Sequence, residues 1–496
     1  MSPGATESAH HGIAWGSPAA RWVLAATVTG SGLALLDATT VSVALPSIGR
    51  QLGATVGGLQ WTVSAYTLTL ASLILLAGSL ADRFGRRRVF VIGIVWFGAA
   101  SALSARAPTL ETLVAARALQ GVGGALLTPG SLAILQASFA EGARAIGAWS
   151  GLGAIAAAVG PLVGGVLVMT VGWRTIFWVN LPVASVVVWI TLRHVPESRA
   201  ASGVARRFDV EGAVLATLGL GFVTWALIAV GERGAEPVVW LIGAAGLLAL
   251  TAFLWVQRRT PEPMMPLALF AARQFSAANA VTFIVYGGMA VLFFLLVVQL
   301  QQVLGASPLL AGAALLPITL FMLALSARAG GVAERAGPRR LMAVGPLVMA
   351  VGLVLVASID ADASYLVDVL PAVAVFGFGL ALMVAPLTAT ALAAADEGRS
   401  GIASGINNAI SRTAGLLAVA AIPPLVGLTG DAFADPARLS AGFRDAMLVA
   451  AVIVASGGVL AWLTIRDESL GGRPACPASR LARRRHCAVD GAPLEP

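Results

Sequence analysis

Residues Gly78 to Arg88 read Gly-Ser-Leu-Ala-Asp-Arg-Phe-Gly-Arg-Arg-Arg, a turn with two glycines, one acid and four arginines between two apolar runs. A second stretch, Gly330 to Arg340, reads Gly-Gly-Val-Ala-Glu-Arg-Ala-Gly-Pro-Arg-Arg and repeats the pattern. The positions that correspond in register are Gly78 and Gly330, Asp82 and Glu334, Arg83 and Arg335, Gly85 and Gly337, and Arg88 and Arg340. The chain is therefore built from two related halves.

Each turn joins two hydrophobic segments that are too long for the core of a soluble protein. Glycine lets the backbone bend tightly, and arginine stays on the side of a membrane that holds positive charge. Each turn is therefore expected at a membrane surface. Two such halves, packed about an axis normal to the bilayer, are typical of secondary transporters.

The composition also indicates a membrane protein. Of the 496 residues, 58% are hydrophobic and 11% charged, with a mean hydropathy of +0.87, whereas about 25% of the residues in a globular protein are charged. The chain has no lysine, so all 32 basic residues are arginine. A phosphate-binding loop of the form GxxxxGK[ST], which needs lysine, is thereby excluded. The energy for transport must come from a gradient or a separate subunit.

Apolar runs of roughly 20 residues or more can cross about 30 Å of hydrocarbon. The sequence predicts fourteen such spans, at residues 22–45, 58–81, 89–106, 110–136, 143–170, 174–192, 210–231, 237–256, 276–302, 309–328, 341–358, 366–394, 401–428 and 443–465. With the N-terminus inside, six of the 32 arginines lie in outer loops or at the outer ends of spans, two lie deep inside spans, and the other 24 lie on the inner side. This asymmetry predicts that both termini are cytoplasmic, and the absence of lysine suggests a bacterial plasma membrane.

The two turns follow the second and the tenth span, so each half has six helices and the seventh and eighth spans form an inserted pair. We therefore predict an all-α polytopic membrane protein with two six-helix bundles. Its expected parts are a cytoplasmic segment 1–21, an N-terminal bundle 22–192, a linker with the two inserted helices 193–275, a C-terminal bundle 276–466 and a disordered cytoplasmic tail 467–496.

A carboxylate inside a bilayer is costly and is therefore a functional candidate. Asp37 lies in the first span, roughly 13 Å below the outer surface, and Arg117 of the antiparallel fourth span lies at roughly 11 Å. The two charges can therefore meet. A buried pair of this kind can exchange its ionic contact for a proton on the acid, so we predict proton coupling here, with a static structural pair as the alternative.

Three further sets of residues are candidates. The fifth span carries Gly147, Gly160, Pro161, Gly164 and Gly165, which predict a hinge or a close-packed seam, or only a generic packing face. Arg412 lies near the middle of the thirteenth span and is a candidate for contact with substrate or for gating, with hydration in a water-filled cavity or binding to backbone carbonyls as the alternative. A substrate cavity is also expected to include Trp61, Tyr66, Gln120, Tyr286, Gln299 and Asn407, with packing as the alternative.

All four histidines, His10, His11, His194 and His486, fall in polar ends or loops, which argues against a membrane enzyme or a metal site.

These residues resemble the signatures of a known family. The chain resembles the major facilitator superfamily, and within it the fourteen-helix branch of the drug:proton antiporters, over nearly its whole length. The turns resemble that superfamily's inner-loop signature, whose acid and arginines latch the two halves in one conformation. The gate positions that this resemblance implies are Gly78, Asp82, Arg83, Gly85, Arg86, Arg87, Glu334, Arg335 and Gly337.

Leu36 to Pro46 resembles the first-helix motif of this branch, with Ser42 in place of a usual asparagine. The fourth-helix motif, whose arginine is implicated in proton transfer, is matched by Leu113, Arg117, Gln120 and Gly121. The fifth-span glycines resemble a motif associated with export, although its middle glycine is Ala156 here.

The resemblance implies a proton-coupled exporter of hydrophobic small molecules such as drugs or antibiotics, with an uptake permease of the same fold as the alternative. We expect no enzymatic activity, no metal and no cofactor beyond the proton gradient. The expected partners are the lipid bilayer, a small hydrophobic substrate and protons, without nucleic acid, and the chain is expected to be a monomer. Because no acid lies deep in the second half, a neutral or monovalent compound is expected. The sequence leaves the substrate and the proton stoichiometry open, and it does not separate drug resistance from self-resistance.

Overall fold

The computed structural model describes residues 13–139, 141–199, 208–394 and 400–467. Most of the predicted cytoplasmic segment and tail, and part of the predicted linker, lie outside the described residues. Within them the chain is helical and forms no strand. The α-helices are α1 (Pro18–Leu52), α2 (Val56–Phe84), α3 (Arg86–Arg106), α4 (Leu110–Ser138), α5 (Gly142–Thr170), α6 (Thr175–Trp178), α7 (Asn180–His194), α8 (Val210–Arg233), α9 (Pro237–Arg259), α10 (Arg273–Gln302), α11 (Pro308–Ala313), α12 (Leu316–Ala336), α13 (Arg339–Val356), α14 (Leu370–Ala393), α15 (Ser400–Leu425) and α16 (Pro436–Thr464).

The helices confirm an all-α polytopic fold. In the described residues, thirteen helices or joined helix pairs are long and apolar enough to cross a membrane. The 26-residue α15 is the fourteenth, and it packs along α10 and α2. It carries three strongly polar side chains, Asn407, Asn408 and Arg412. The chain is therefore a multi-pass membrane protein.

Local sequence signals set the ends of α1, which is longer than the predicted span. Ser17 caps its start by accepting a hydrogen bond from the backbone N–H of Ala20, and Pro18 occupies the first turn. The helix continues through Pro46 and ends at Gly53, whose φ of +61° is left-handed. Asp37, Thr39, Ser42 and Val43 of this 35-residue helix take part in the contacts described below.

The two repeated turns have the same local geometry. Gly85 and Gly337 end α2 and α12 with φ of +109° and +86°, which an L side chain rarely adopts. An acid from the end of each half then caps the helix that follows. Glu197 accepts a hydrogen bond from the backbone N–H of Arg87 at 3.1 Å, and Asp467 accepts one from that of Arg339 at 3.1 Å.

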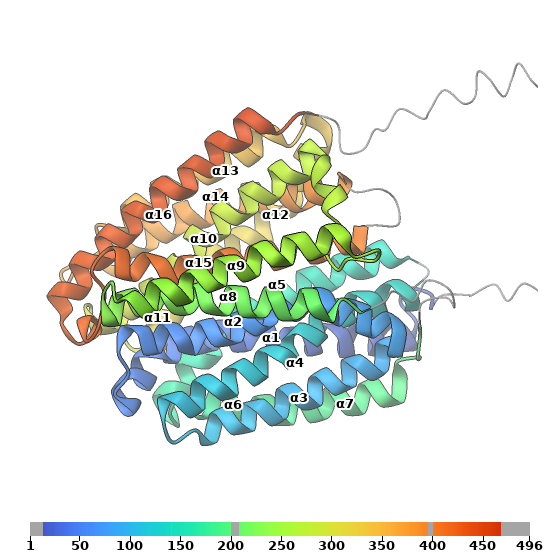
Figure 1. Cartoon of the computed structure of the whole chain (residues 1–496), viewed down its shortest axis with the longest axis horizontal. Coiled ribbons are helices and arrows are strands. Elements are labelled where there is room, and N and C mark those ends of the chain that lie inside the picture. Colours follow the sequence, from blue (N-terminus) through green and yellow to red (C-terminus); the bar gives the residue numbers. More distant parts are fainter. Residues whose placement is uncertain (1–12, 140, 200–207, 395–399, 468–496) are drawn as a thin grey trace, which may run out of the picture.

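Figure 1 shows the two groups of helices, α1 to α7 in blue and teal and α10 to α16 in yellow to red. The inserted pair, α8 and α9, lies across the front of this view in green. α8 packs against α2 and α15, one helix from each group. We define the end of the bundle that holds the α2–α3 and α12–α13 turns as the terminal side, and the other end as the distal side. The domain limits given above stay predictions.

Candidate functional site

An ion pair between Asp37 of α1 and Arg117 of α4 lies at the centre of the first helix group. Arg117 Nη1 donates to Asp37 Oδ2, and both side chains are at most 1% exposed. The depths expected from the sequence therefore bring the two charges together. Burying both charges is costly, and further hydrogen bonds must satisfy their remaining polar atoms.

Two amides and a hydroxyl complete this buried network. Gln120 Nε2 donates to Asp37 Oδ1 at 2.8 Å, and Asn180 Nδ2 donates to the same oxygen at 3.0 Å. Both amides also donate to Ser101 Oγ. Both carboxylate oxygens thus accept hydrogen bonds from described side chains. Sequence reasoning missed Asn180 and Ser101, and the only signal was an amide in an apolar run.

Arg117 is held by its other contacts as well. Its Nε donates to the Thr62 carbonyl at 3.2 Å, its Nη1 donates to Gln120 Oε1 at 2.7 Å, and its guanidinium lies 4.5 Å from the centre of the Tyr66 ring. Tyr66 donates to the Ala34 carbonyl at 3.3 Å. Tyr66 and Gln120, which were expected in the cavity, therefore belong to the surroundings of the ion pair.

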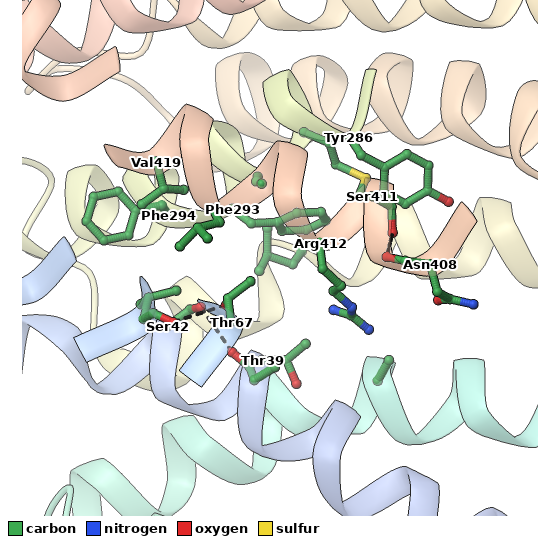
Figure 2. Close-up of a pocket in the computed structure, with 18 of the residues that line it drawn as sticks. Thr39, Ser42, Thr67, Tyr286, Phe293, Phe294, Asn408, Ser411, Arg412 and Val419 are labelled. Atoms are coloured by element: carbon green, nitrogen blue, oxygen red, sulfur yellow. Dashed lines mark hydrogen bonds between the residues drawn. The ribbon is translucent and has the colours of Figure 1, made fainter. Parts of the chain in front are cut away.

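A separate cavity of about 510 Å³ lies between the two helix groups. Figure 2 shows Thr39 and Ser42 of α1 and Thr67 of α2 on one side of it. Facing them are the aromatic side chains of α10 and the polar side chains of α15. The labelled residues of this facing side are Tyr286, Phe293, Phe294, Asn408, Ser411, Arg412 and Val419. A volume of this size can hold a drug-sized molecule.

Only some of the residues that were expected in the cavity line it in the structure. Tyr286, Asn407 and Arg412 line it, whereas Trp61, Tyr66, Gln120 and Gln299 are not among its lining residues. Gln299 instead donates to the Ile359 carbonyl at 2.9 Å, within the second helix group. The difference is rotational, because depth along a helix does not say which way a side chain points.

The glycines of α5 form a close-packed seam over part of their length. A Cβ on Gly160 or Gly164 would collide with Thr39 or Thr40 of α1, and Thr40 Oγ1 donates to the Gly160 carbonyl at 3.2 Å. A Cβ on Gly165 would lie 2.6 Å from Leu309 Cα, in α11 of the other group. Gly147 has open space instead. Pro161 lines the cavity.

Several contacts join the two helix groups on the distal side. Gln301 Nε2 of α10 donates to the Val43 carbonyl of α1 at 2.9 Å. Gln60 Nε2 of α2 donates to the Val419 carbonyl of α15 at 2.6 Å. With the close approach of Gly165 to α11, these two hydrogen bonds hold the two helix groups together on the distal side.

The predicted gate residues lie on the terminal side, and none of the contacts given for them joins the two helix groups. Asp82 pairs with Arg86 at 2.9 Å, and Arg87 and Arg88 each lie 3.8 Å from Glu197. The guanidinium of Arg83 lies 4.8 Å from the centre of the Phe208 ring. In the second repeat, Glu334 and Arg335 are exposed. Gly78 has only a distant neighbour, at 3.9 Å.

No group of three or more histidine, cysteine, aspartate or glutamate side chains that could hold a metal ion occurs in the part of the chain that the structure describes. The charged chemistry of the site therefore rests on Asp37, Arg117 and Arg412.

Comparison with known proteins places this geometry in a family. The Major Facilitator Superfamily matches residues 27–419 of the chain. The puromycin resistance protein pur8 of Streptomyces alboniger is 35% identical, over 90% of this chain and 92% of that protein. The multidrug resistance protein Stp of Mycobacterium tuberculosis is 38% identical, over 78% of this chain and 72% of that protein.

A solved structure has the same fold. A bacterial homologue of the human lysosomal transporter Spinster superposes with a TM-score of 0.62 at 17% identity, over 90% of this chain and 97% of that one. The sequence match and the shared fold agree, and the chain belongs to the Major Facilitator Superfamily.

Proposed function

We propose that this protein exports hydrophobic small molecules across the bacterial plasma membrane in exchange for protons, by alternating access. Its family consists of transporters rather than enzymes, and relatives that it matches over most of their length are named for puromycin and multidrug resistance. These names support export of a drug or antibiotic. The proposed energy source is the proton gradient, with no cofactor, and the proposed working unit is a monomer in the bilayer that binds only substrate and protons, without nucleic acid.

The buried acid carries the proposal of proton coupling. Among the described residues the buried carboxylates are Asp37 and Asp209, and only Asp37 lies inside a span, because Asp209 caps the start of α8. A proton on Asp37 would remove the charge that holds Arg117. The pair can therefore exist in a bonded and a released form, which is what coupling to a proton requires.

α1 can transmit this change to the cavity and to the distal seal. Asp37 faces Arg117, Thr39 and Ser42 line the cavity, and the Val43 carbonyl accepts the hydrogen bond from Gln301. These residues lie within two turns of one helix. A shift of α1 on protonation would therefore alter the substrate site and the contact between the two halves together.

The positions of the arginines support one orientation of the protein in the membrane. The turns and helix ends of the terminal side carry Arg83, Arg86, Arg87, Arg88, Arg258, Arg259, Arg335, Arg339 and Arg340. We propose that this side is cytoplasmic. The distal side is then the outer side. Because the two helix groups are in contact there, we propose that this conformation is the inward-facing state. The acids of the two turns would latch the halves only in the outward-facing state.

The test measures efflux of the fluorescent dye N-phenylnaphthylamine from energised bacterial cells that express the protein. We expect efflux by the parent, loss of efflux with Asp37→Asn, and loss with a proton uncoupler. Glu141→Gln, at an exposed pair with Arg144 on the terminal side, is a control for protein amount and insertion. Efflux that survives both the uncoupler and Asp37→Asn would refute proton coupling, and net uptake of dye would favour the permease.

A further inference from the structure

The cavity between the two helix groups carries one kind of charge. Among its lining residues in the described chain, Arg412 is the only one with an ionised side chain, and no aspartate or glutamate is present. The other lining residues are apolar, aromatic, hydroxyl or amide side chains. The cavity therefore has a net positive charge at the depth of the middle of α15.

The guanidinium of Arg412 has no partner in the described residues. The ion pairs found there include Arg117 but not Arg412, and no hydrogen bond from Arg412 is found. In Figure 2 its guanidinium extends away from α15 into the space between the helices. A guanidinium has five N–H donors in a fixed planar arrangement that matches a carboxylate or sulfonate.

Three hydroxyl groups of the cavity donate their protons to backbone carbonyls and are not available to a ligand as donors. Thr39 donates to the Leu36 carbonyl at 3.0 Å, Thr67 to that of Val63 at 3.1 Å and Ser411 to that of Asn408 at 2.9 Å. The Tyr286 hydroxyl has no hydrogen bond to a described residue and lies on the same side of the cavity as Arg412. Arg412 is thus the charged donor that remains for a ligand, and the hydroxyls of Tyr286 and Ser64 are neutral donors without a partner among the described residues.

Asp37 does not neutralise Arg412 in this conformation. Both of its oxygens accept hydrogen bonds within the first helix group, and it is not a lining residue of the cavity. An arginine near the middle of a bilayer is costly unless it is paired or hydrated. The guanidinium must therefore be hydrated by water or paired with a negatively charged substrate.

We propose that the cavity binds a hydrophobic compound with one negative charge, whose acid group pairs with Arg412 and whose rings pack against Phe293 and Phe294. This inference rests on the proposed export function and names the class of its substrate. It narrows the expected neutral or monovalent compound to a monovalent organic anion.

The charge of the substrate has a consequence for transport. Export of one anion in exchange for one inward proton moves two charges across the membrane, whereas export of a neutral compound for one proton moves one. The membrane potential, negative inside, then assists both the outward anion and the inward proton. Transport of the anion should therefore depend more steeply on the membrane potential than transport of a neutral compound.

The test compares two fluorescent probes with the same rings, anilinonaphthalene sulfonate, which is an anion, and N-phenylnaphthylamine, which is neutral. Binding is measured on purified protein in lipid nanodiscs, with empty nanodiscs subtracted. We expect the parent to bind the anion more tightly. Arg412→Gln should weaken binding of the anion by about tenfold or more, as expected for one charge-assisted contact, with little change for the neutral probe. Arg412→Lys should keep most of the preference.

Arg444→Gln, at an exposed position of α16, controls for the loss of a positive charge as such. An equal or greater affinity of the parent for the neutral probe, or the same anion preference in Arg412→Gln, would overturn the inference. The measurement needs no gradient, so failure of the antiport mechanism would leave the binding preference intact. An exporter whose binding ignores Arg412 would keep the proposed function and lose this substrate class.

Discussion

Asp37 and Arg117 form an ion pair across the α1–α4 contact, with both side chains at most 1% exposed. Arg117→Gln would leave the acid without its counter-charge, which costs about 3–5 kcal/mol for a buried pair. Asp37→Asn would leave Arg117 unpaired in the same way. We expect each single variant to unfold at a lower temperature than the parent, as measured by thermal unfolding in detergent.

The double variant Asp37→Asn with Arg117→Gln separates stability from coupling. With both charges gone, most of the lost stability should return, because the remaining amides can hydrogen-bond each other. Proton-driven efflux should stay absent. Asp82→Asn, which removes a pair whose acid is 45% exposed, should cost no more than about 1 kcal/mol. A double variant as unstable as either single one would contradict this account.

The seam between α5 and α11 predicts a second effect. Gly165→Ala would place a Cβ 2.6 Å from Leu309 Cα, so the two helices must separate on the distal side. Such overpacking costs about 1–3 kcal/mol. We expect lower dye efflux and faster labelling of Ser42→Cys, in the cavity, by a membrane-impermeant maleimide added from outside the cell. The native Cys476 and Cys487 are first replaced by serine.

Gly147→Ala is the matched control, because it lies on the same helix with nothing within 4 Å of its Cβ position. It should leave efflux and labelling unchanged. Equal labelling in the two variants would show that the α5–α11 contact does not hold the distal side closed.

The sequence predicted the depth of the important side chains in the membrane better than the direction in which they point from their helices. Counting residues from the span ends placed Asp37 and Arg117 at similar depths, and they meet because a helix has a fixed rise per residue. Gln120 was expected in the cavity but lies beside Asp37. Its spacing of three residues from Arg117 places both on one helix face, a signal that was present in the sequence.

Other parts of the site could not be predicted from one helix at a time. Asn180 reaches Asp37 because α7 packs against α1, and no pattern within α7 points to that neighbour. The seam of α5 likewise depends on Thr39 and Thr40, which lie on another helix. The fold class, by contrast, followed from hydrophobic length alone, because every span must satisfy its own backbone hydrogen bonds in lipid.

Glu197 and Asp467 occupy equivalent positions in the two halves, and each accepts a hydrogen bond from the first turn of the helix that follows the repeated turn. We therefore predict that α3 and α13 are capped in the same way. Glu197→Ala removes the acceptor for the Arg87 N–H, and Asp467→Ala removes that for the Arg339 N–H. Losing such a cap costs about 0.5–2 kcal/mol. Hydrogen exchange followed by mass spectrometry should show faster exchange at residues 86–89 in the first variant and at 339–342 in the second.

Each effect should stay within its own half, because each acid contacts only the turn of that half. Glu141→Ala, which breaks an exposed pair with Arg144, controls for the loss of an acid on the terminal side. Faster exchange at both turns in either variant would mean that the caps act through a shared structure and not as separate copies.

The hydrogen bond from Gln301 to the Val43 carbonyl tests whether the distal contacts set the conformational equilibrium. Gln301 is 9% exposed, and its amide reaches from α10 across to α1. Gln301→Leu removes a bond worth about 0.5–1.5 kcal/mol, so the ratio of closed to open distal side should fall by about 2- to 10-fold. Labelling of Ser42→Cys from outside should accelerate by the same factor.

Gln302→Leu changes the neighbouring amide, which makes no hydrogen bond to a described residue, and it should leave the labelling rate unchanged. If both variants accelerate labelling equally, the effect comes from the general packing of α10, and the bond to Val43 does not hold the two halves together.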